Sequence, residues 1–266
     1  MMNLRILLGV GIATVLVGCT TVPETGRRQV MLVSAADEAQ MGLNAFDQVK
    51  KEEKISKDSA ANAQVQRVGK RIAQSVGREI PNAQWEFVVF DSDQVNAFAL
   101  PAGKVGVYTG LLKLAASDDE LAAVMGHEIA HVSSRHGAER TSQGYLVAGG
   151  AALTDIGLQV KDVDPAKRNA ILSAYGMAAT VGAILPYSRL HESEADAIGL
   201  RFAAGAGYDP RAAVSFWKKM AAKSNGQNKP PRLLSTHPSD ATRIAKLEEL
   251  APQYMAAYET NKKRFQ

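Results

Sequence analysis

Apolar residues recur at helical spacing in the first third of the chain. Between residues 61 and 76 they fall every three or four positions, which puts them on one face of an amphipathic helix. A more polar helix is expected just before it, running to about Lys54. It begins at Ser34, which can cap the helix N-terminus, with Asp37 three residues further on.

The second half of the chain has an almost continuously helical pattern. Residues 145–185 are rich in Ala, Gly and Leu and predict a long helical stretch, interrupted at about 161–165. Residues 171–185 carry few polar side chains but fall short of the roughly 20 apolar residues of a membrane span, so we expect a buried helix. Pro186 is expected to break the chain. The remaining predicted elements are helices at 188–204, 211–223 and 239–250 and a loop at 224–232.

Strand-like runs are confined to a short region near residue 100. They lie at 85–90, 97–100 and 105–108 and are rich in Val and Phe. The turn sequence Pro101-Ala102-Gly103-Lys104 predicts that the last two pair as a hairpin. Because helices dominate and the strands cluster, the sequence predicts an α+β, mainly helical fold with one domain at 34–266.

Residues 1–18 are predicted to be a targeting signal and not part of the fold. A short basic start precedes roughly a dozen apolar residues, too few for a membrane span. Leu16-Val17-Gly18-Cys19 resembles the bacterial lipobox, in which cleavage before the cysteine leaves an acylated N-terminus. An ordinary cleaved signal with a chance cysteine is the alternative. We expect a lipid anchor at Cys19, a polar tether at 19–33 and, since Thr20 is not the Asp of inner-membrane retention, a location on the periplasmic face of the outer membrane.

Composition narrows the class of protein. The chain has 266 residues, is 46% hydrophobic and 22% charged, and carries a formal net charge of +4. These values are ordinary for a globular protein and exclude disordered, collagen-like and coiled-coil classes. Like charges form no run of five, so no nucleic-acid partner is expected. With one cysteine no internal disulfide can form. The oligomeric state is not fixed by any of these features.

The main chemical signal is the segment His127-Glu128-Ile129-Ala130-His131, within a helix predicted from the capping box at 117–120. Histidines four residues apart leave the same helix face and can bind one metal ion. Zinc suits imidazole nitrogen and tolerates three protein ligands plus water, whose proton Glu128 can accept. About 0.005 such matches are expected by chance in a chain of this composition. The sequence therefore predicts one Zn²⁺ bound by His127 and His131.

A third protein ligand must come from another segment. His136 lies about 140° round the helix from His131 and is expected to face away from the metal. Glu192 and Asp196 are one turn apart and share a helix face, whereas Glu194 lies about 200° from Glu192 and points elsewhere. This face offers one carboxylate ligand and a second carboxylate that can accept the free N–H of a metal-bound histidine.

Four ordered blocks resemble the CAAX-prenyl-protease/HtpX-like zinc metallopeptidases, and especially their soluble OMA-type bacterial lipoprotein members. The blocks are Asn96–Val105, His127–His131, Ser188–Asp196, and Ser235–Ser239 with Arg243 and Ile244. The resemblance implies a zincin-like (gluzincin) fold, with a small sheet beside two crossed helices. In this family the third ligand is the Glu of an ExxxD pair, which corresponds to Glu192, with Asp196 as its partner.

The resemblance also places the histidine of a His-Pro motif, His237, near the metal. Two catalytic roles are open for it. It can donate to the oxyanion of the tetrahedral intermediate, where one good donor contributes about 10²–10³ in rate. It can instead occupy the fourth zinc position in a resting enzyme and move away for substrate. A turn histidine without a role is the remaining alternative.

Together these features predict a zinc metalloendopeptidase that cleaves unfolded or misassembled cell-envelope proteins, with water activated by zinc and Glu128. The substrate is expected to lie extended against a sheet edge, supplied by 97–100 or 105–108. Three other interpretations stay open: a non-proteolytic zinc-binding lipoprotein acting as chaperone or scaffold, a latent peptidase held shut by His237, and a zinc hydrolase of non-peptide bonds such as cell-wall cross-links. The expected partners are polypeptides and the membrane reached through Cys19.

Overall fold

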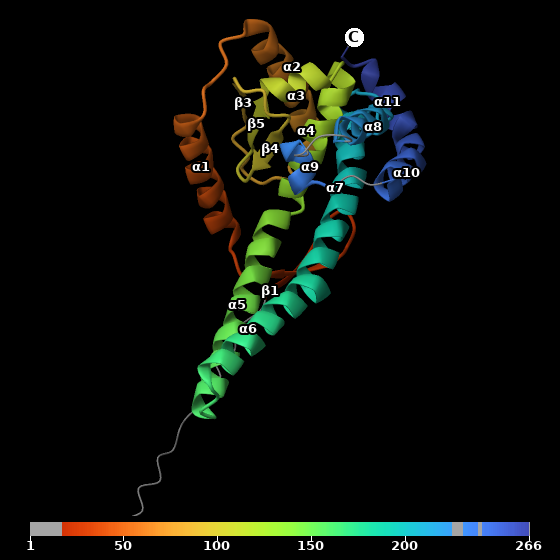
Figure 1. Cartoon of the computed structure of the whole chain (residues 1–266). Helices are drawn as coiled ribbons and strands as arrows, with labels where there is room; N and C mark the ends of the chain where they lie inside the picture. Colours follow the sequence, from red (N-terminus) through yellow and green to blue (C-terminus); the bar gives the residue numbers. More distant parts are fainter. Residues whose placement is uncertain (1–17, 225–230, 239–240, 266) are drawn as a thin grey trace, which may run out of the picture.

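Helices make up most of the structure, a computed structural model that describes residues 18–224, 231–238 and 241–265 (Figure 1). The α-helices are α1 (Ala35–Glu52), α2 (Ser59–Val76), α3 (Thr109–Leu114), α4 (Asp118–Ser133), α5 (His136–Val160), α6 (Pro165–Ala179), α7 (Leu185–Gly205), α8 (Ala212–Ser224), α9 (Arg232–Thr236), α10 (Ala241–Leu250) and α11 (Met255–Lys262). A π-helical turn, η1 (Thr180–Ile184), joins α6 to α7, and a 3-10 turn, η2 (Ala251–Tyr254), precedes α11. The strands are β1 (Gly18–Thr21), β2 (Arg28–Met31), β3 (Glu86–Phe90), β4 (Ala97–Leu100) and β5 (Lys104–Tyr108). The α+β, mainly helical prediction is confirmed.

A three-stranded sheet with the order β3-β5-β4 lies beside α4 (Figure 1). Strand β4 pairs antiparallel with β5, from Ala97 opposite Val107 to Leu100 opposite Lys104, as the predicted hairpin requires. Strand β3 pairs with the other side of β5 in parallel. The run 105–108 is therefore wrong as a substrate edge, because β5 is hydrogen-bonded on both sides. The open edge beside α4 belongs to β4.

The predicted amphipathic helix at 61–76 is confirmed as α2. Its apolar face is buried against β3, α4 and α7, and Val65, Val68 and Ile72 have no exposed surface. Gly69 allows the closest approach, since a Cβ there would lie 2.5 Å from the ring of Phe87. This packing holds the sheet against the helix that carries the HExxH segment.

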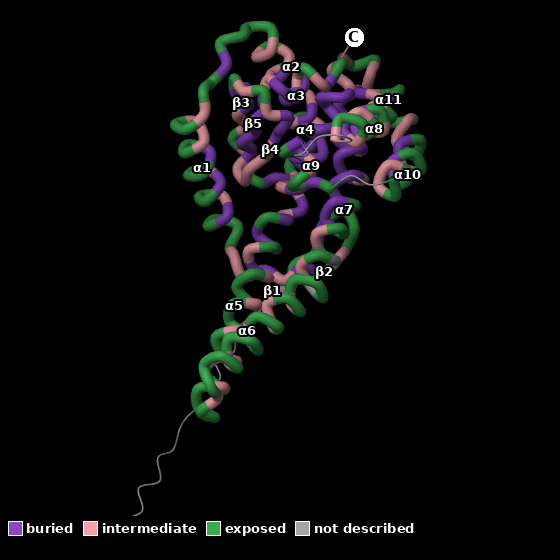
Figure 2. Tube along the Cα trace, viewed as in Figure 1, coloured by how far each residue is buried: buried purple, intermediate pink, exposed green. Residues whose placement is uncertain are grey.

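A helical arm, formed by α5, α6, η1 and the start of α7, projects from this body (Figure 1). Figure 2 shows it almost wholly exposed, and none of the described side chains from residue 143 to 190 is buried. The expectation of a buried helix at 171–185 is wrong, since Met177 and Val181 are 65% and 66% exposed. The helices of the arm cover mainly one another, and none of the described residues covers their outer faces. No helix among the described residues is long and apolar enough to span a membrane.

Pro186 does not break the chain as expected. Helix α6 continues through η1 into α7, and the proline lies within the first turn of α7. Two predicted elements lie partly outside the described residues. They are the loop at 224–232, of which residues 225–230 are not described, and the last helix, of which residues 239–240 are not described.

The residues predicted to be a tether include two short strands, β1 and β2. Strands β1 and β2 form an antiparallel hairpin in which Cys19 is opposite Val30. Val22 is 1% exposed, and the N–H of Leu32 donates to Ser142 Oγ on α5 at 2.9 Å. Part of the predicted tether packs on the protein, because Arg27 contacts Glu139 on α5 and Glu194 on α7. Residues 1–17 of the predicted signal lie outside the described residues.

Candidate metal centre

Helix α4 holds the HExxH segment inside the protein. Its N-terminus is a capping box, in which Ser117 Oγ accepts the N–H of Glu120 and Glu120 Oε2 accepts the N–H of Ala116. Every residue from Glu120 to His131 is buried. A helix buried on all sides presents its histidines to other protein elements, so any ligand they bind lies in the interior.

Two glycines allow α4 and α7 to cross in contact. A Cβ on Gly126 would lie 2.9 Å from the carbonyl oxygen of Gly199, and one on Gly199 would lie 2.8 Å from the backbone nitrogen of His127. No larger residue fits at either position without moving a backbone. This close crossing brings the face of α7 that carries Glu192 up to the two histidines of α4.

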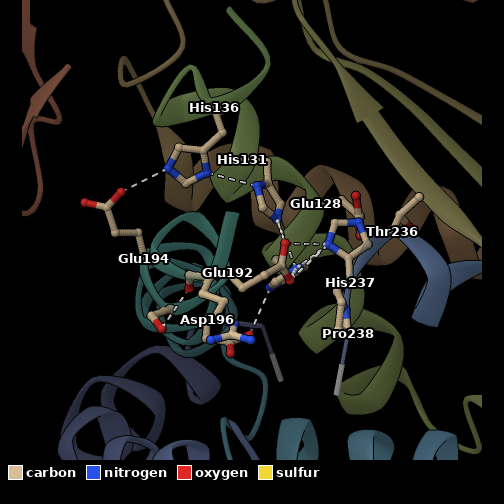
Figure 3. A network of polar contacts seen from close by, with 12 residues as sticks. Glu128, His131, His136, Glu192, Glu194, Asp196, Thr236, His237 and Pro238 are labelled. Atoms are coloured by element: carbon tan, nitrogen blue, oxygen red, sulfur yellow. Dashed lines mark hydrogen bonds and ion pairs between the residues drawn. The ribbon is translucent and has the colours of Figure 1, made fainter. Parts of the chain in front are cut away.

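Four side chains converge on one point, and we call them the donor cluster: His127, His131, Glu192 and His237. One ligand atom from each lies within 4.8 Å of the others, and all four residues are buried. Figure 3 shows three of them, His131, Glu192 and His237, side by side. His127 Nε2 lies 3.1 Å from His131 Nε2 and 3.2 Å from His237 Nδ1. Nitrogens on a tetrahedral zinc at 2.0–2.1 Å are about 3.3 Å apart, so these spacings fit the ion.

Charge balance also fits a divalent cation. Three buried carboxylates, Glu128, Glu192 and Asp196, face one cation, Arg243, whose side chain is 8% exposed. With neutral histidines the formal charge of this group is −2, which is costly in a buried site unless it is compensated. A single Zn²⁺ supplies the missing charge, and nitrogen and carboxylate oxygen are ligands that it accepts.

The pKa shifts of the donor cluster reflect the same excess of negative charge. Burial lowers the pKa of His127, but hydrogen bonds to Asp196 and Glu192 outweigh it and raise the pKa to about 9. Burial alone would raise the pKa of Glu192, yet its contacts with three histidines hold that pKa far below its usual value. Burial holds the pKa of His131 well below its usual value, so this imidazole is a ready neutral ligand.

Glu128 lies beside the donor cluster without belonging to it. Its Oε1 is buried and, among the described residues, has no hydrogen-bond partner of good geometry; His237 Nε2 lies 3.3 Å away. A buried carboxylate oxygen without a donor is costly, and such groups are typical of reactive sites. Glu128 is thus placed to accept a proton.

His237 reaches the donor cluster from the short helix α9. Its N–H donates to the carbonyl of Leu233 at 2.8 Å, and the buried Leu233 donates in turn to the carbonyl of Val95. Its Nδ1 lies 3.0 Å from Glu192 Oε1. Of the two roles left open by the sequence, this position matches a fourth metal ligand.

Asp196 and Arg243 contact members of the donor cluster without belonging to it. Asp196 Oδ1 lies 3.0 Å from His127 Nδ1, the ring nitrogen that faces away from the other donors. Arg243 donates to both oxygens of Asp196 at 2.8 and 2.7 Å, lies 3.1 Å from Glu192 Oε2 and stacks on Trp217 at 3.9 Å. Arg243 belongs to the last of the four sequence blocks, but its role is not predictable from sequence, because its contact with Asp196 joins two helices distant in the chain.

A second buried polar group, missed by the sequence analysis, lies next to the donor cluster. Glu139 accepts from Arg27 at 2.8 and 2.7 Å, from Gln29 at 2.9 Å, and contacts His191 Nε2 at 2.9 Å. Burial alone would raise the pKa of Glu139, but these contacts, chiefly the one from Arg27, lower it to about 2. This group joins the N-terminal hairpin to α5 and α7.

Glu139→Gln is expected to lower the free energy of unfolding by about 2–3 kcal/mol at pH 7. The carboxyl has a folded-state pKa of about 2 against 4.5 for the free group, so its stabilisation is complete above about pH 4.5 and is lost as the pH falls toward 2. Urea unfolding from pH 7 to pH 3 should show the two proteins converging in stability below pH 4.5. A constant difference across that range would contradict this assignment.

Two histidines and a glutamate from crossed helices, with a glutamate beside them, define a mononuclear zincin-type metallopeptidase site. A model of peptidase family M48 matches residues 59–251, and the chain belongs to this family of zinc metallopeptidases. The predicted family and the zinc cofactor are confirmed.

Similar proteins are also named as metalloendopeptidases or proteases. The chain is 35% identical over 247 residues to the mitochondrial metalloendopeptidase OMA1 of Schizosaccharomyces pombe, covering 90% of this chain and 68% of that protein. It is 39% identical over 187 residues to the mitochondrial metalloendopeptidase OMA1 of Bos taurus, covering 68% and 35%. It is 27% identical over 237 residues to the beta-barrel assembly-enhancing protease of Escherichia coli (strain K12), covering 88% and 47%. The chain thus spans half or less of the last two proteins.

Proposed function

We propose that this protein is an endopeptidase that cleaves unfolded or misassembled polypeptides of the cell envelope. The observation that carries the proposal is the convergence of His127, His131 and Glu192 beside the buried Glu128. The name of the Escherichia coli relative, a beta-barrel assembly-enhancing protease, supports an envelope substrate.

Different residues of the chain have different roles in peptide hydrolysis. Zinc bound to these ligands would lower the pKa of a water molecule and polarise the scissile carbonyl. Glu128 accepts the proton of the attacking water and passes it to the leaving amine. Asp196 fixes the ring of His127 through its Nδ1, and Arg243 holds Asp196 in place.

The edge of β4 is the best place for an extended substrate. Among the described strands, β4 pairs only with β5, so its outer backbone groups face away from the sheet. The outer edge of β3 is partly occupied, since Ser56 donates to Val89 and Asp91 donates to Lys54. A peptide added to β4 would run beside α4 and its HExxH segment. Pairing through backbone hydrogen bonds depends little on the substrate's side chains but requires an extended segment, so it favours unfolded chains.

The proposal is tested by incubating the zinc-loaded protein with unfolded casein, a folded control protein and peptidoglycan fragments. Cleavage of casein alone, lost with a chelator and restored by zinc, is the expected result. Binding of casein without cleavage would favour the chaperone interpretation, and cleavage of peptidoglycan would favour a cell-wall hydrolase. Either of these outcomes would contradict the proposal.

A latent resting state is a second candidate property, favoured by the position of His237. Catalytic zinc sites keep one position open, whereas sites closed by four protein ligands are structural. Nδ1 of His237 lies within the donor cluster, so the site as folded has four protein donors. Movement of α9 would open the fourth position for substrate.

His237→Ala is therefore expected to raise the rate of casein cleavage several-fold, because it opens the fourth position. Initial rates at equal zinc occupancy measure the effect. Thr236→Ala is the matched control, since this neighbour on α9 bonds only backbone carbonyls, those of Arg232 and Leu233, among the contacts described. A lower rate for His237→Ala would favour the oxyanion role, and an unchanged rate would favour a histidine without a catalytic role. Either result would remove the support for self-inhibition.

Attachment to the outer membrane through an acylated Cys19 is part of the proposal. The strand that contains Cys19 pairs with β2, which packs on α5 at the base of the arm. Of the described residues, twelve large apolar side chains are exposed, and ten lie between residues 145 and 190. An anchor here would bring this apolar surface near lipid. Labelled palmitate should enter the wild type and not Cys19→Ser; equal labelling of both would contradict the anchor.

A further inference from the structure

His136 lies next to the donor cluster but is not part of it. It is completely buried, and its Nδ1 lies 2.9 Å from Nδ1 of His131, on the side of that ring away from the other donors (Figure 3). Helix α4 ends at Ser133, and Arg135 takes a left-handed conformation with φ of 54°. This turn brings the first residue of α5 back against the last histidine of α4.

The hydrogen-bond chemistry of the two rings admits one arrangement when a metal is bound. His131 faces the donor cluster through Nε2, so a metal-binding neutral ring carries its proton on Nδ1. That N–H points at Nδ1 of His136, which must therefore accept it. The proton of His136 is then on Nε2, which donates to Glu194 Oε2 at 3.2 Å.

The chain of contacts continues to the N-terminal hairpin. Glu194 Oε2 accepts from Arg27 Nε at 2.9 Å, and its Oε1 accepts from Thr25 Oγ1 at 2.6 Å. Thr25 and Arg27 belong to the connection between β1 and β2. The ring of His136 is also stacked on His191, with centroids 4.1 Å apart. His136 is thus held on three sides.

We propose that His136 is a positioning residue for the metal ligand His131. Glu194 and Arg27 hold His136 from α7 and from the β1–β2 hairpin, which makes that hairpin part of the support of the metal site. The role is to fix the ring orientation and proton position of His131 before metal binds. The inference rests on metal binding by the donor cluster and does not depend on proteolysis.

Zinc affinity, measured by competition with a chelator, tests the proposal. His136→Leu removes the acceptor and should weaken zinc binding by about 10–100-fold, the usual loss when the partner of a metal-bound histidine is removed. His136→Asn keeps an acceptor oxygen near the position of Nδ1 and should stay within about threefold of the wild type. The visible absorption of the Co²⁺-loaded protein should change in the Leu variant and not in the Asn variant.

Two further variants distinguish a specific effect on zinc affinity from a general loss of protein stability. Ser142→Ala removes another buried contact between α5 and the N-terminal segment, and no bond of Ser142 involves the donor cluster, so zinc affinity should be unchanged. Glu194→Leu leaves both rings but removes the acceptor of His136, and should weaken zinc binding at least about threefold even if His136→Leu fails to fold.

Equal losses of affinity in the Leu and Asn variants, or wild-type affinity in both His136→Leu and Glu194→Leu, would overturn the proposal. If His136→Leu does not fold, wild-type affinity in Glu194→Leu alone has the same consequence. A protein that shows the expected pattern of zinc affinities but cleaves no polypeptide would contradict only the proposed function.

Discussion

Glu128→Gln is expected to lower the rate of casein cleavage by about 10²–10⁴-fold, the range typical for loss of a general base. The amide has nearly the shape of the carboxylate but cannot accept a proton at neutral pH. Because Glu128 lies outside the donor cluster, the variant should keep its zinc. Initial rates, with zinc content measured on the same samples, separate loss of the base from loss of the metal.

The matched control is Glu120→Gln, which changes another buried glutamate of the same helix. Glu120 contacts Lys219 and Ser215 and closes the capping box, a role that glutamine also fills. We expect near wild-type cleavage from this variant. Equal cleavage by Glu128→Gln and the wild type would show that the proposed proton transfer is wrong.

The features predictable from sequence are those set by local periodicity. The i, i+4 spacing of His127 and His131 needs only a helix to bring both rings to one face, and the capping box marks where that helix begins. The hairpin of β4 and β5 follows from two apolar runs and a turn. Local periodicity is not enough to assign Glu192, because a carboxylate on a distant helix looks like an ordinary surface residue until α4 and α7 are known to cross.

His136 is outside the donor cluster, as expected, but helical-wheel arithmetic does not reveal its contact with His131. The angle of about 140° from His131 assumes a helix that continues, but α4 ends at Ser133 and Arg135 adopts a positive φ that a non-glycine residue rarely takes. Glu194 was correctly placed away from Glu192, yet this direction is a buried contact and not solvent. Arg27 looks like a tether residue because its partners lie over 100 residues away.

Arg243→Met is expected to lower the unfolding free energy of the zinc-free protein by about 3–5 kcal/mol, the range for removing one partner of a buried ion pair. The substitution keeps an apolar stem against Trp217 but leaves Asp196 and Glu192 without their cation. Urea unfolding in the presence of a chelator measures the effect.

Zinc and a second substitution show whether charge is the cause. Bound zinc supplies positive charge to the same carboxylates, so the loss caused by Arg243→Met should be smaller in the zinc-loaded protein. Adding Asp196→Asn removes one of the stranded charges and should restore part of the stability, a coupling that a double-mutant cycle measures directly. Arg243→Lys keeps the charge but not the two-oxygen contact with Asp196, and should fall between the wild type and the Met variant. If Arg243→Met and the double variant are equally unstable, uncompensated charge on Asp196 is not the cause of the loss.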